Sequence, residues 1–395
     1  MFITNFVQIC QSTVVMNIVK EWLLIILLFF SACSSTRHTP KTSEISRLKF
    51  LSEYTIPYDG QFDNTTIGGL SGIDYNFQKN IYYLVSDDRS AKNPARFYTA
   101  QILIHQSKID SVIFIKTTFL KDQLGNFYPN SLQDPYHTPD PEALRYNLKS
   151  NHFTWSSEGE RIINPQKTVL QNPAVTEINS QGNYLDTFQL PLQLQVHATD
   201  NGPRKNGVFE GLTFDDHYQH LYVSVEEPLY EDGPRAGIKD STGMARIVEF
   251  NIHTKKAIAQ YAYTIDAVAH PPIPSSGFKI NGISDILWIG NKKLLVIERS
   301  YSTGRPASTI KVFLADLSSA ENIQKISSLK NKPDVKMVTK KLLLNMDDLG
   351  FYIDNIEGVT FGPSLSNGNK TLIFIADNNF SPLEKTQFLL FEVEN

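Results

Sequence analysis

The chain has few cysteines, no excess of basic residues and only one long apolar run. Its two cysteines, Cys10 and Cys33, both lie near the N-terminus. We therefore expect no disulfide framework, no thiolate nucleophile and no cysteine-ligated metal in the rest of the protein. The 37 Lys and Arg residues are balanced by 41 Asp and Glu residues, giving a net charge of −4. No basic stripe interleaves with aromatic residues, so no nucleic acid partner is predicted.

Several common catalytic motifs are also absent. The sequence contains no G-x-S-x-G elbow, no HExxH helix, no P-loop and no G-x-G-x-x-G turn. Ser71, in GLSGI, is therefore a poor nucleophile candidate. The nine histidines do not gather at metal-ligand spacing. His137 and His270 lie in Pro-rich connectors, where a loop can cover a site. His137 is an acid–base candidate, against the simpler interpretation of a solvated loop histidine.

The apolar run Trp22–Phe30 is too short to span a bilayer, which needs about 20 apolar residues. The small residues before Cys33 resemble the signal of a bacterial lipoprotein, and this resemblance implies lipidation of Cys33. An uncleaved membrane anchor is the alternative. The true start of the signal is then either Met1 or Met16.

This interpretation divides the chain into three parts and places the protein in the bacterial cell envelope. We expect a signal peptide over residues 1–32, a lipidated cysteine with a flexible polar tether over 33–47, and a folded domain over 48–395. The lipid bilayer is then a partner through the N-terminal lipid. The sequence predicts no oligomeric state.

A short phrase recurs five times in the expected domain. Each copy has an acidic or small polar residue before an apolar strand, and a second strand then ends on an acid. The start-to-start spacings are 71, 68, 74 and 73 residues, and the copies begin at Ser71, Glu142, Glu210, Ser284 and Glu357. Self-similarity at a fixed period indicates a repeat architecture.

The repeats indicate an all-β protein built as a β-propeller. Val, Ile, Phe, Tyr and Thr gather in short runs broken by Gly, Pro, Asn and Asp, and no segment keeps a helical period for four turns. The third repeat is expected to form four strands, Gly211–Phe214, Leu221–Val225, Ala245–Ile252 and Ala257–Ile265. Four antiparallel strands repeated radially describe propeller blades. We predict five blades, with a sixth only if one is hidden among the connectors.

The two ends of the domain are expected to close the ring. The last repeat supplies only three strands, ending with Gln387–Glu394. The segment Leu48–Pro57 precedes the first repeat and has no partner there. We predict that this segment completes the last blade, which removes two exposed sheet edges.

The hairpin in each repeat predicts a ring of carboxylates at one mouth of the channel. The residue that starts strand one and the residue that ends strand two lie at the same end of a hairpin. The expected sets are Ser71 with Asp87 and Asp88, Glu142 with Glu158, Glu210 with Glu226 and Glu227, Ser284 and Asp285 with Glu298, and Glu357 with Asp377. Arginines are interspersed among these acids, and Arg145 is expected to share the channel side of its strand.

Three interpretations of this ring remain open. The charges pair across blades as a structural network, the acids bind Ca²⁺, or metal and arginine together hold an anionic ester. The residues assigned to the last two are Glu142, Glu226, Glu357 and Asp377 as metal ligands, Glu210 as general base, and Arg89, Arg246 and Arg299 as the anion clamp.

Six segments in order, among them EGLTFDD, PDPEALRY, NIEGVTFGP and FIADNNF, resemble the phytase-like domain family over residues 50–393. The resemblance implies an exported β-propeller with phosphoesterase or esterase activity. The expected function is a Ca²⁺-assisted hydrolase of a small anionic ester at the acidic mouth. The alternative is a non-catalytic ligand- or protein-binding propeller. Ser71 and Ser284 stand where the other repeats have Glu, so a lopsided site is expected.

Overall fold

β-Strands dominate the computed structural model, which describes residues 45–239, 242–330, 332 and 334–395. Ile45–Asn395 form one compact unit. In the described part of this unit, the helices are three short 3₁₀ turns, Leu192–Leu194, Tyr230–Asp232 and Met346–Leu349. Within the described residues, no helix has the length and apolar character needed to cross a membrane. The predicted signal peptide and Cys33 lie outside these residues.

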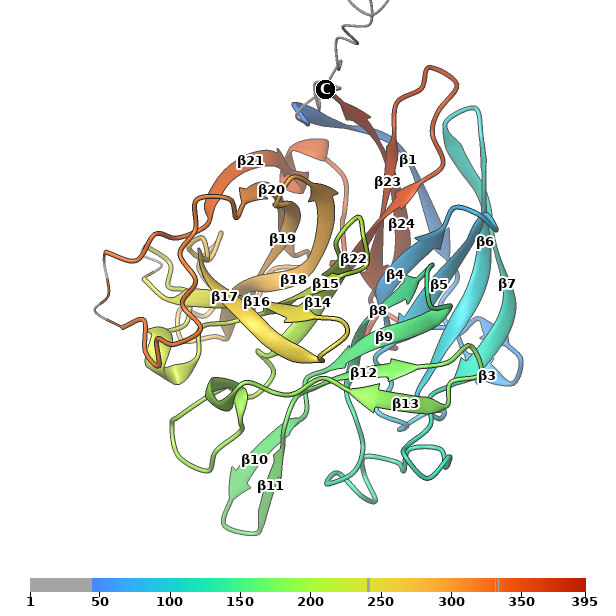
Figure 1. The fold of residues 1–395 in the computed structure, drawn as a ribbon. Helices are drawn as coiled ribbons and strands as arrows, with labels where there is room; N and C mark the ends of the chain where they lie inside the picture. Colours follow the sequence, from blue (N-terminus) through green and yellow to red (C-terminus); the bar gives the residue numbers. More distant parts are fainter. Residues whose placement is uncertain (1–44, 240–241, 331, 333) are drawn as a thin grey trace, which may run out of the picture. The chain divides into compact units, whose positions relative to one another are not determined.

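Five antiparallel sheets of four strands follow one another along the chain as blades (Figure 1). Blade one contains β4 (Leu70–Asn76), β5 (Ile81–Ser86), β6 (Arg96–His105) and β7 (Lys108–Phe119). Blade two contains β8 (Pro141–Asn147), β9 (His152–Ser157), β12 (Ala174–Ile178) and β13 (Tyr184–Thr187). Blade three contains β14 (Phe209–Phe214), β15 (His220–Val225), β16 (Met244–Asn251) and β17 (Lys256–Thr264). Blade four contains β18 (Lys279–Gly290), β19 (Lys293–Ser302), β20 (Thr309–Asp316) and β21 (Thr339–Asn345).

The last blade confirms the predicted ring closure. It contains β22 (Asn355–Gly362), β23 (Thr371–Asp377) and β24 (Thr386–Glu394), with β1 (Arg47–Ile56) as its fourth strand. β1 pairs antiparallel with β24 from Arg47 opposite Glu394 to Ile56 opposite Thr386. The five-bladed all-β propeller is therefore correct. Two further hairpins lie outside the blades, β2 (Gln61–Phe62) with β3 (Thr65–Thr66) and β10 (Glu160–Asn164) with β11 (Lys167–Gln171).

Apolar side chains fill the space between neighbouring blades. Ile247 of blade three and Leu294 of blade four belong to one such buried cluster. The first strands approach one another closely around the channel. A Cβ on Gly211 would lie 2.5 Å from the backbone nitrogen of Ile286, and one on Gly72 would lie 2.9 Å from the carbonyl oxygen of Glu142. Backbone packing thus requires glycine after the leading residue in blades one and three.

A single guanidinium joins all five blades at the channel axis. Arg145, on β8 of blade two, donates hydrogen bonds to the carbonyl of Ile73 in blade one and to that of Leu212 in blade three, the latter at 2.7 Å. It also donates to the carbonyl of Val359 in blade five at 3.1 Å and to the carboxylate of Asp285 in blade four at 2.8 Å. Because Arg145 contacts all four of the other blades at the channel axis, its side chain lies between the two mouths of the channel.

Candidate functional site at the acidic mouth

The strand pairing places the predicted acids at one mouth. In β4–β5, Leu70 lies opposite Ser86, so Ser71 and Asp87 occupy the same end of the hairpin. The same relation holds in the other blades. In each hairpin, the first-strand residue at the channel axis has a partner in the second strand, and the residue three positions after this partner faces the mouth. In blade three, for example, Leu212 pairs with Val223, and Glu226 faces the mouth. These residues are Asp87, Glu158, Glu226 and Asp377.

Blade four differs from the prediction by one residue. Ile286 pairs with Val296, so the equivalent mouth position is Arg299 and not Glu298. Successive side chains of a strand point to opposite faces. Glu298 therefore faces away from the mouth, where it accepts a hydrogen bond from the Tyr263 hydroxyl at 2.8 Å and pairs with Lys340. The ring of strand-two residues thus consists of four acids and one arginine.

A cavity of about 670 Å³ opens at this mouth. Seven acidic side chains line it: Asp87, Asp140, Glu142, Glu158, Glu210, Glu226 and Glu357. Four basic side chains line it as well: Arg89, Lys205, Arg235 and Arg299. The acids outnumber the bases, and Asp377 lies buried beside Asp87 and Glu357.

Arg299 is fully occupied by its neighbours in the ring. Its guanidinium pairs with Glu226 at 3.1 Å and with Glu357, and it also donates to the Asn355 side chain. Burial works to lower the pKa of Arg299, but the two carboxylates outweigh burial and raise it. Arg299 therefore holds carboxylates of blades three and five in place from blade four.

Arg89 keeps donors to spare. One of its terminal nitrogens pairs with Glu160 at 2.6 Å, and its Nε lies 3.5 Å from Asp140. Its Nε and Nη2 atoms are buried and have no hydrogen-bond partner. Nη2 has no partner and Nε only the longer ion pair with Asp140, and the planar fork that they form suits an anionic oxygen.

Asp377 is a buried carboxylate of the ring with few partners. Its side chain is 0% exposed, and no side chain donates a hydrogen bond to either carboxylate oxygen; the one favourable contact comes from the backbone N–H of Asn379. Oε2 of Glu357 is likewise buried without a partner. Buried carboxylates are normally paired, hydrogen-bonded or bound to metal. This part of the mouth could therefore hold a cation between the carboxylates of Asp87, Glu357 and Asp377.

Burial changes the acidity of the whole ring. Desolvation raises the pKa values of Asp87, Glu142, Glu158, Glu210 and Asp377 well above their usual values, and the neighbouring carboxylates raise them further. Burial also raises the pKa of Asp140 to about 7, against the opposing effect of Arg89. Groups that titrate near neutral pH can exchange protons or accept a metal ion.

The carboxylates fit the ligand requirements of Ca²⁺. They form three groups in which one ligand oxygen from each residue lies within 4.8 Å of the others. The groups are Asp87 with Glu357 and Asp377, Asp140 with Glu142 and Glu158, and Glu158 with Glu210 and Glu226. Ca²⁺ binds oxygen at about 2.5 Å, so ligands on opposite sides of one ion lie about 5 Å apart.

The structure does not bring Arg246 to this mouth. It lies on β16 and is completely buried, where its Nε and Nη2 form a two-pronged pair with Asp232 at 2.6 and 2.8 Å. Its remaining contacts go to the side chain of Gln260 and the carbonyl of Ile326. Arg246 is thus a structural partner of the Asp232 turn, because the acid that pairs with it comes from a connector and not from a blade.

Sequence reasoning missed the contributions of the connectors. Asp140, Lys205 and Arg235 reach the cavity from loops that carry no repeat signal. Asp140 stands two residues before Glu142 in PDPE, which was the one local indication available. His137, considered as an acid–base candidate, is exposed and pairs with Asp134 at 2.8 Å.

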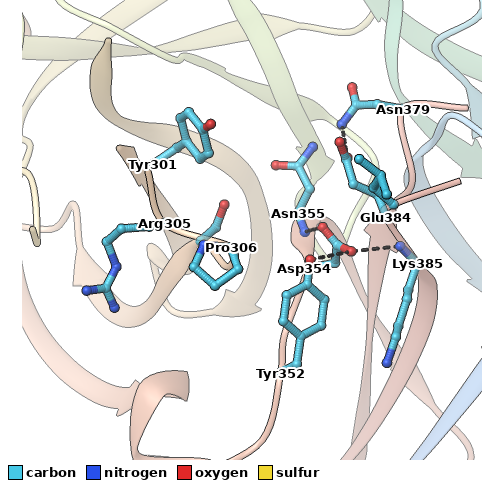
Figure 2. A pocket seen from close by; sticks show the side chains of 11 residues that line it. Tyr301, Arg305, Pro306, Tyr352, Asp354, Asn355, Asn379, Glu384 and Lys385 are labelled. Carbon is cyan, nitrogen blue, oxygen red and sulfur yellow. Dashed lines mark hydrogen bonds between the residues drawn. The ribbon is translucent and has the colours of Figure 1, made fainter. Parts of the chain in front are cut away.

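A second cavity, of about 680 Å³, adjoins the acidic one and shares Tyr301 and Asn379 with it. Figure 2 shows Arg305 and Pro306 on one side of this cavity and Tyr352 and Lys385 on the other. The carboxylate of Asp354 accepts from the Tyr352 hydroxyl at 3.0 Å and from the Lys385 backbone at 2.7 Å, which fixes one wall (Figure 2). The two cavities together form an extended mouth lined by charged and aromatic residues.

Fold and site together define a β-propeller with a buried carboxylate cluster at one end of its channel. The model of the phytase-like family, described as esterase-like activity of phytase, matches residues 65–380. The chain belongs to this family, as the sequence motifs indicated.

Comparison with other proteins adds only distant similarities. No curated protein sequence matches this chain. An endo-arabinase from Bacteroides thetaiotaomicron VPI-5482 is 11% identical with a TM-score of 0.42, covering 87% of this chain and 97% of its own. A thermostable family-43 glycoside hydrolase is 12% identical with a TM-score of 0.45, covering 85% and 91%. A gluconolactonase from Xanthomonas campestris is 11% identical with a TM-score of 0.35, covering 88% and 91%.

Proposed function

We propose that the protein is a divalent-metal-dependent hydrolase of a small anionic ester, a phosphoric ester in the first place, with Ca²⁺ as the metal. The observation that carries this proposal is Asp377, which is completely buried, receives no side-chain hydrogen bond and lies beside Asp87 and Glu357. Asp87 and Glu357 line a cavity together with Arg89, whose Nε and Nη2 make no hydrogen bond. The Asp377 carboxylate favours binding of a cation, and the Arg89 guanidinium favours binding of an anion. A metal ion together with an anionic substrate satisfies both.

Asp377, Asp87 and Glu357 are the proposed metal-holding set, because their ligand oxygens converge and two of the residues carry unpartnered buried oxygens. Glu142 and Glu226 belong to the neighbouring sets and would hold a further ion there. A bound Ca²⁺ would supply positive charge to the ester oxygens and lower the pKa of a coordinated water.

The protein's own groups have separate roles in this proposal. Arg89 orients the anionic group through its free Nε and Nη2 donors. Glu210 accepts the proton of the attacking water, since its carboxylate lines the cavity and burial among other carboxylates raises its pKa, which makes it a stronger base than an exposed glutamate. Arg299 acts as a positioning residue, because Glu226 and Glu357 already occupy its donors. The adjoining cavity of Figure 2 offers room for the alcohol part of the ester.

A non-catalytic binding propeller is the second candidate. The contacts of Arg299 with Glu226 and Glu357 cross three blades, as a purely structural network would. In that case the ring stabilises the blades with or without a structural metal, and substitution of Glu210 affects stability alone.

The test uses the full chain in mild detergent, first in EDTA and then with added Ca²⁺. Thermal unfolding and release of p-nitrophenol from p-nitrophenyl phosphate and acetate are measured on the same samples. We expect Ca²⁺ to raise the melting temperature and to start turnover, and Glu210→Gln to lower turnover by about 100-fold or more while the fold is retained. Glu321→Gln, on an exposed connector, is the matched control.

Each other outcome selects a different conclusion. A melting shift without turnover of either ester would reject catalysis and favour the binding propeller. If neither a shift nor turnover appears, the ring is a salt-bridge network and the metal proposal fails with the hydrolase.

We also propose that the protein is anchored to the cell-envelope membrane through a lipid on Cys33. The support is the sequence around that residue, which lies outside the described part of the structure. Cys33→Ser should move the protein from the membrane fraction to the soluble fraction and abolish incorporation of labelled fatty acid. Unchanged labelling of this variant would reject the proposal.

A further inference from the structure

The mouth opposite the carboxylates carries an aromatic residue from every blade. In each first strand, the residue four positions after the leading residue is aromatic: Tyr75, Tyr146, Phe214, Trp288 and Phe361. Four residues of strand span about 13 Å, which places these rings at the far end of the channel. All five line one cavity of about 500 Å³, with Arg145 also in its lining.

Packing between blades explains only part of this ring. Trp288 of blade four stacks on Tyr222 of blade three with centroids 5.0 Å apart, whereas Tyr75 stacks at 4.6 Å on Tyr82, its partner across the strands of blade one. Tyr75 and Trp288 also line the cavity. Phe77, in the turn after β4, also lines the cavity and remains 64% exposed. A large exposed phenylalanine at the rim adds no burial to the core.

The charges at this mouth favour a cation. Asp74, Asp215 and Asp216 line the cavity, against Lys370 and Arg145. The charge of Arg145 is already balanced by Asp285 at 2.8 Å. Acids therefore outnumber the remaining cation at an aromatic mouth, which is the reverse of what an anionic ligand needs.

One internal contact shows the chemistry that such a mouth offers. The Lys370 ammonium lies over the ring of Phe361, 5.0 Å from its centroid. The faces of aromatic rings carry negative charge and attract ammonium groups, most strongly where water is excluded. Pockets of this volume with mostly apolar walls and a few polar groups are typical small-molecule sites.

We propose that this aromatic mouth binds a small organic ammonium cation, with the rings around the positive group and the carboxylates of Asp74 and Asp216 nearest to its charge. The site is separate from the acidic cavity, because Arg145 fills the channel between them. In three copies of the phrase, a glutamate at the acidic mouth and an aromatic residue at the opposite mouth are four residues apart: Glu142 with Tyr146, Glu210 with Phe214, and Glu357 with Phe361.

The test titrates the full chain with tetramethylammonium and with choline, followed by tryptophan fluorescence and calorimetry. Trp288 lines the mouth, while Trp155 is buried elsewhere, so the difference between wild type and Trp288→Phe isolates the reporter. The neutral carbon analogue of choline, 3,3-dimethyl-1-butanol, separates charge recognition from apolar binding. Saturating Ca²⁺ is present throughout, so that the carboxylates of the other mouth do not capture the probe.

We expect saturable binding of both ammonium probes and at least tenfold weaker binding of the neutral analogue. Phe77→Leu should weaken binding by about three- to thirtyfold, the effect of losing one aromatic contact. Asp216→Asn should weaken it while retaining the hydrogen bond that its oxygen accepts from the Trp288 indole at 2.9 Å. Phe127→Leu, another exposed aromatic outside this mouth, is the matched control and should bind as the wild type does.

Four outcomes would overturn the proposal. The first three are the absence of saturable binding, equal binding of the neutral analogue, and binding that survives both Phe77→Leu and Asp216→Asn. Binding of a neutral disaccharide in place of the ammonium probes would reassign the mouth to carbohydrate and would also reject the proposal as stated.

Discussion

Replacing Arg145 by methionine should destabilise the whole propeller more than any single exposed ion pair does. Arg145 and Asp285 are both almost fully buried, and their pair lies where the first strands of all five blades meet. Methionine keeps most of the apolar volume but removes every donor. The change leaves the Asp285 carboxylate without its cation and several carbonyl groups without their partner.

The size of the effect follows from these losses. Removing one partner of a buried ion pair costs about 3–5 kcal/mol. The carbonyl hydrogen bonds donated by the guanidinium are worth about 1.5–3 kcal/mol each when no water replaces them. Protonation of Asp285 limits the loss, since burial already raises its pKa to about 6 despite Arg145. We therefore expect a loss of about 3–5 kcal/mol, a large part of the usual 5–15 kcal/mol of stability.

Urea unfolding followed by far-UV circular dichroism measures this loss. Arg47→Met is the control, because Arg47 is 70% exposed and lies 4.0 Å from Glu394; it should cost less than about 1 kcal/mol. Adding Asp285→Asn to Arg145→Met should recover about 1–3 kcal/mol by removing the unpaired charge. A loss below about 1 kcal/mol for Arg145→Met, or no recovery in the double variant, would refute the assigned role.

Two further predictions concern the charged residues. In EDTA, the free energy of unfolding should fall as pH rises from about 5 to 8, because burial raises the pKa values of Asp140 to about 7 and Glu227 to about 8. In this pH range the native state holds protons that the unfolded chain has released, and added Ca²⁺ should make the free energy of unfolding less dependent on pH. Urea unfolding at three pH values measures this dependence. A free energy of unfolding that increases toward pH 8 would contradict the prediction. Arg246→Met should lower the free energy of unfolding by about 3–5 kcal/mol, because it removes the buried pair with Asp232. Release of p-nitrophenol per folded molecule should stay unchanged. A loss of turnover without a loss of stability would show that Arg246 takes part in the site.

The fold and the acidic mouth were predictable because both depend on local pattern. A period of about 70 residues with four strand signals indicates a blade, and unpaired strands at the two ends indicate closure. Within a hairpin, the start of one strand and the end of the next must lie together. Glu142, Glu210 and Glu357 could therefore be placed at one mouth from their positions alone.

Tertiary structure decided what each charged group contacts. A one-residue difference in register exchanges Glu298 for Arg299 at the mouth, and a shift of one residue reverses the face of a strand. Arg246 turns toward Asp232, which comes from a connector without repeat pattern.

Arg145 shows most clearly which contacts could not be predicted from the sequence. In the repeated phrase it is one variable position, where the other blades have Asp74, Thr213, Leu287 and Thr360. Its partners lie from 67 to 214 residues away in the sequence. The sequence by itself determined the blades, their closure and the end at which the acids gather, because strand periodicity and hairpin geometry act over a few residues. Which charges pair, and which remain open to a ligand, was decided only when the ring closed and brought the five first strands around one axis.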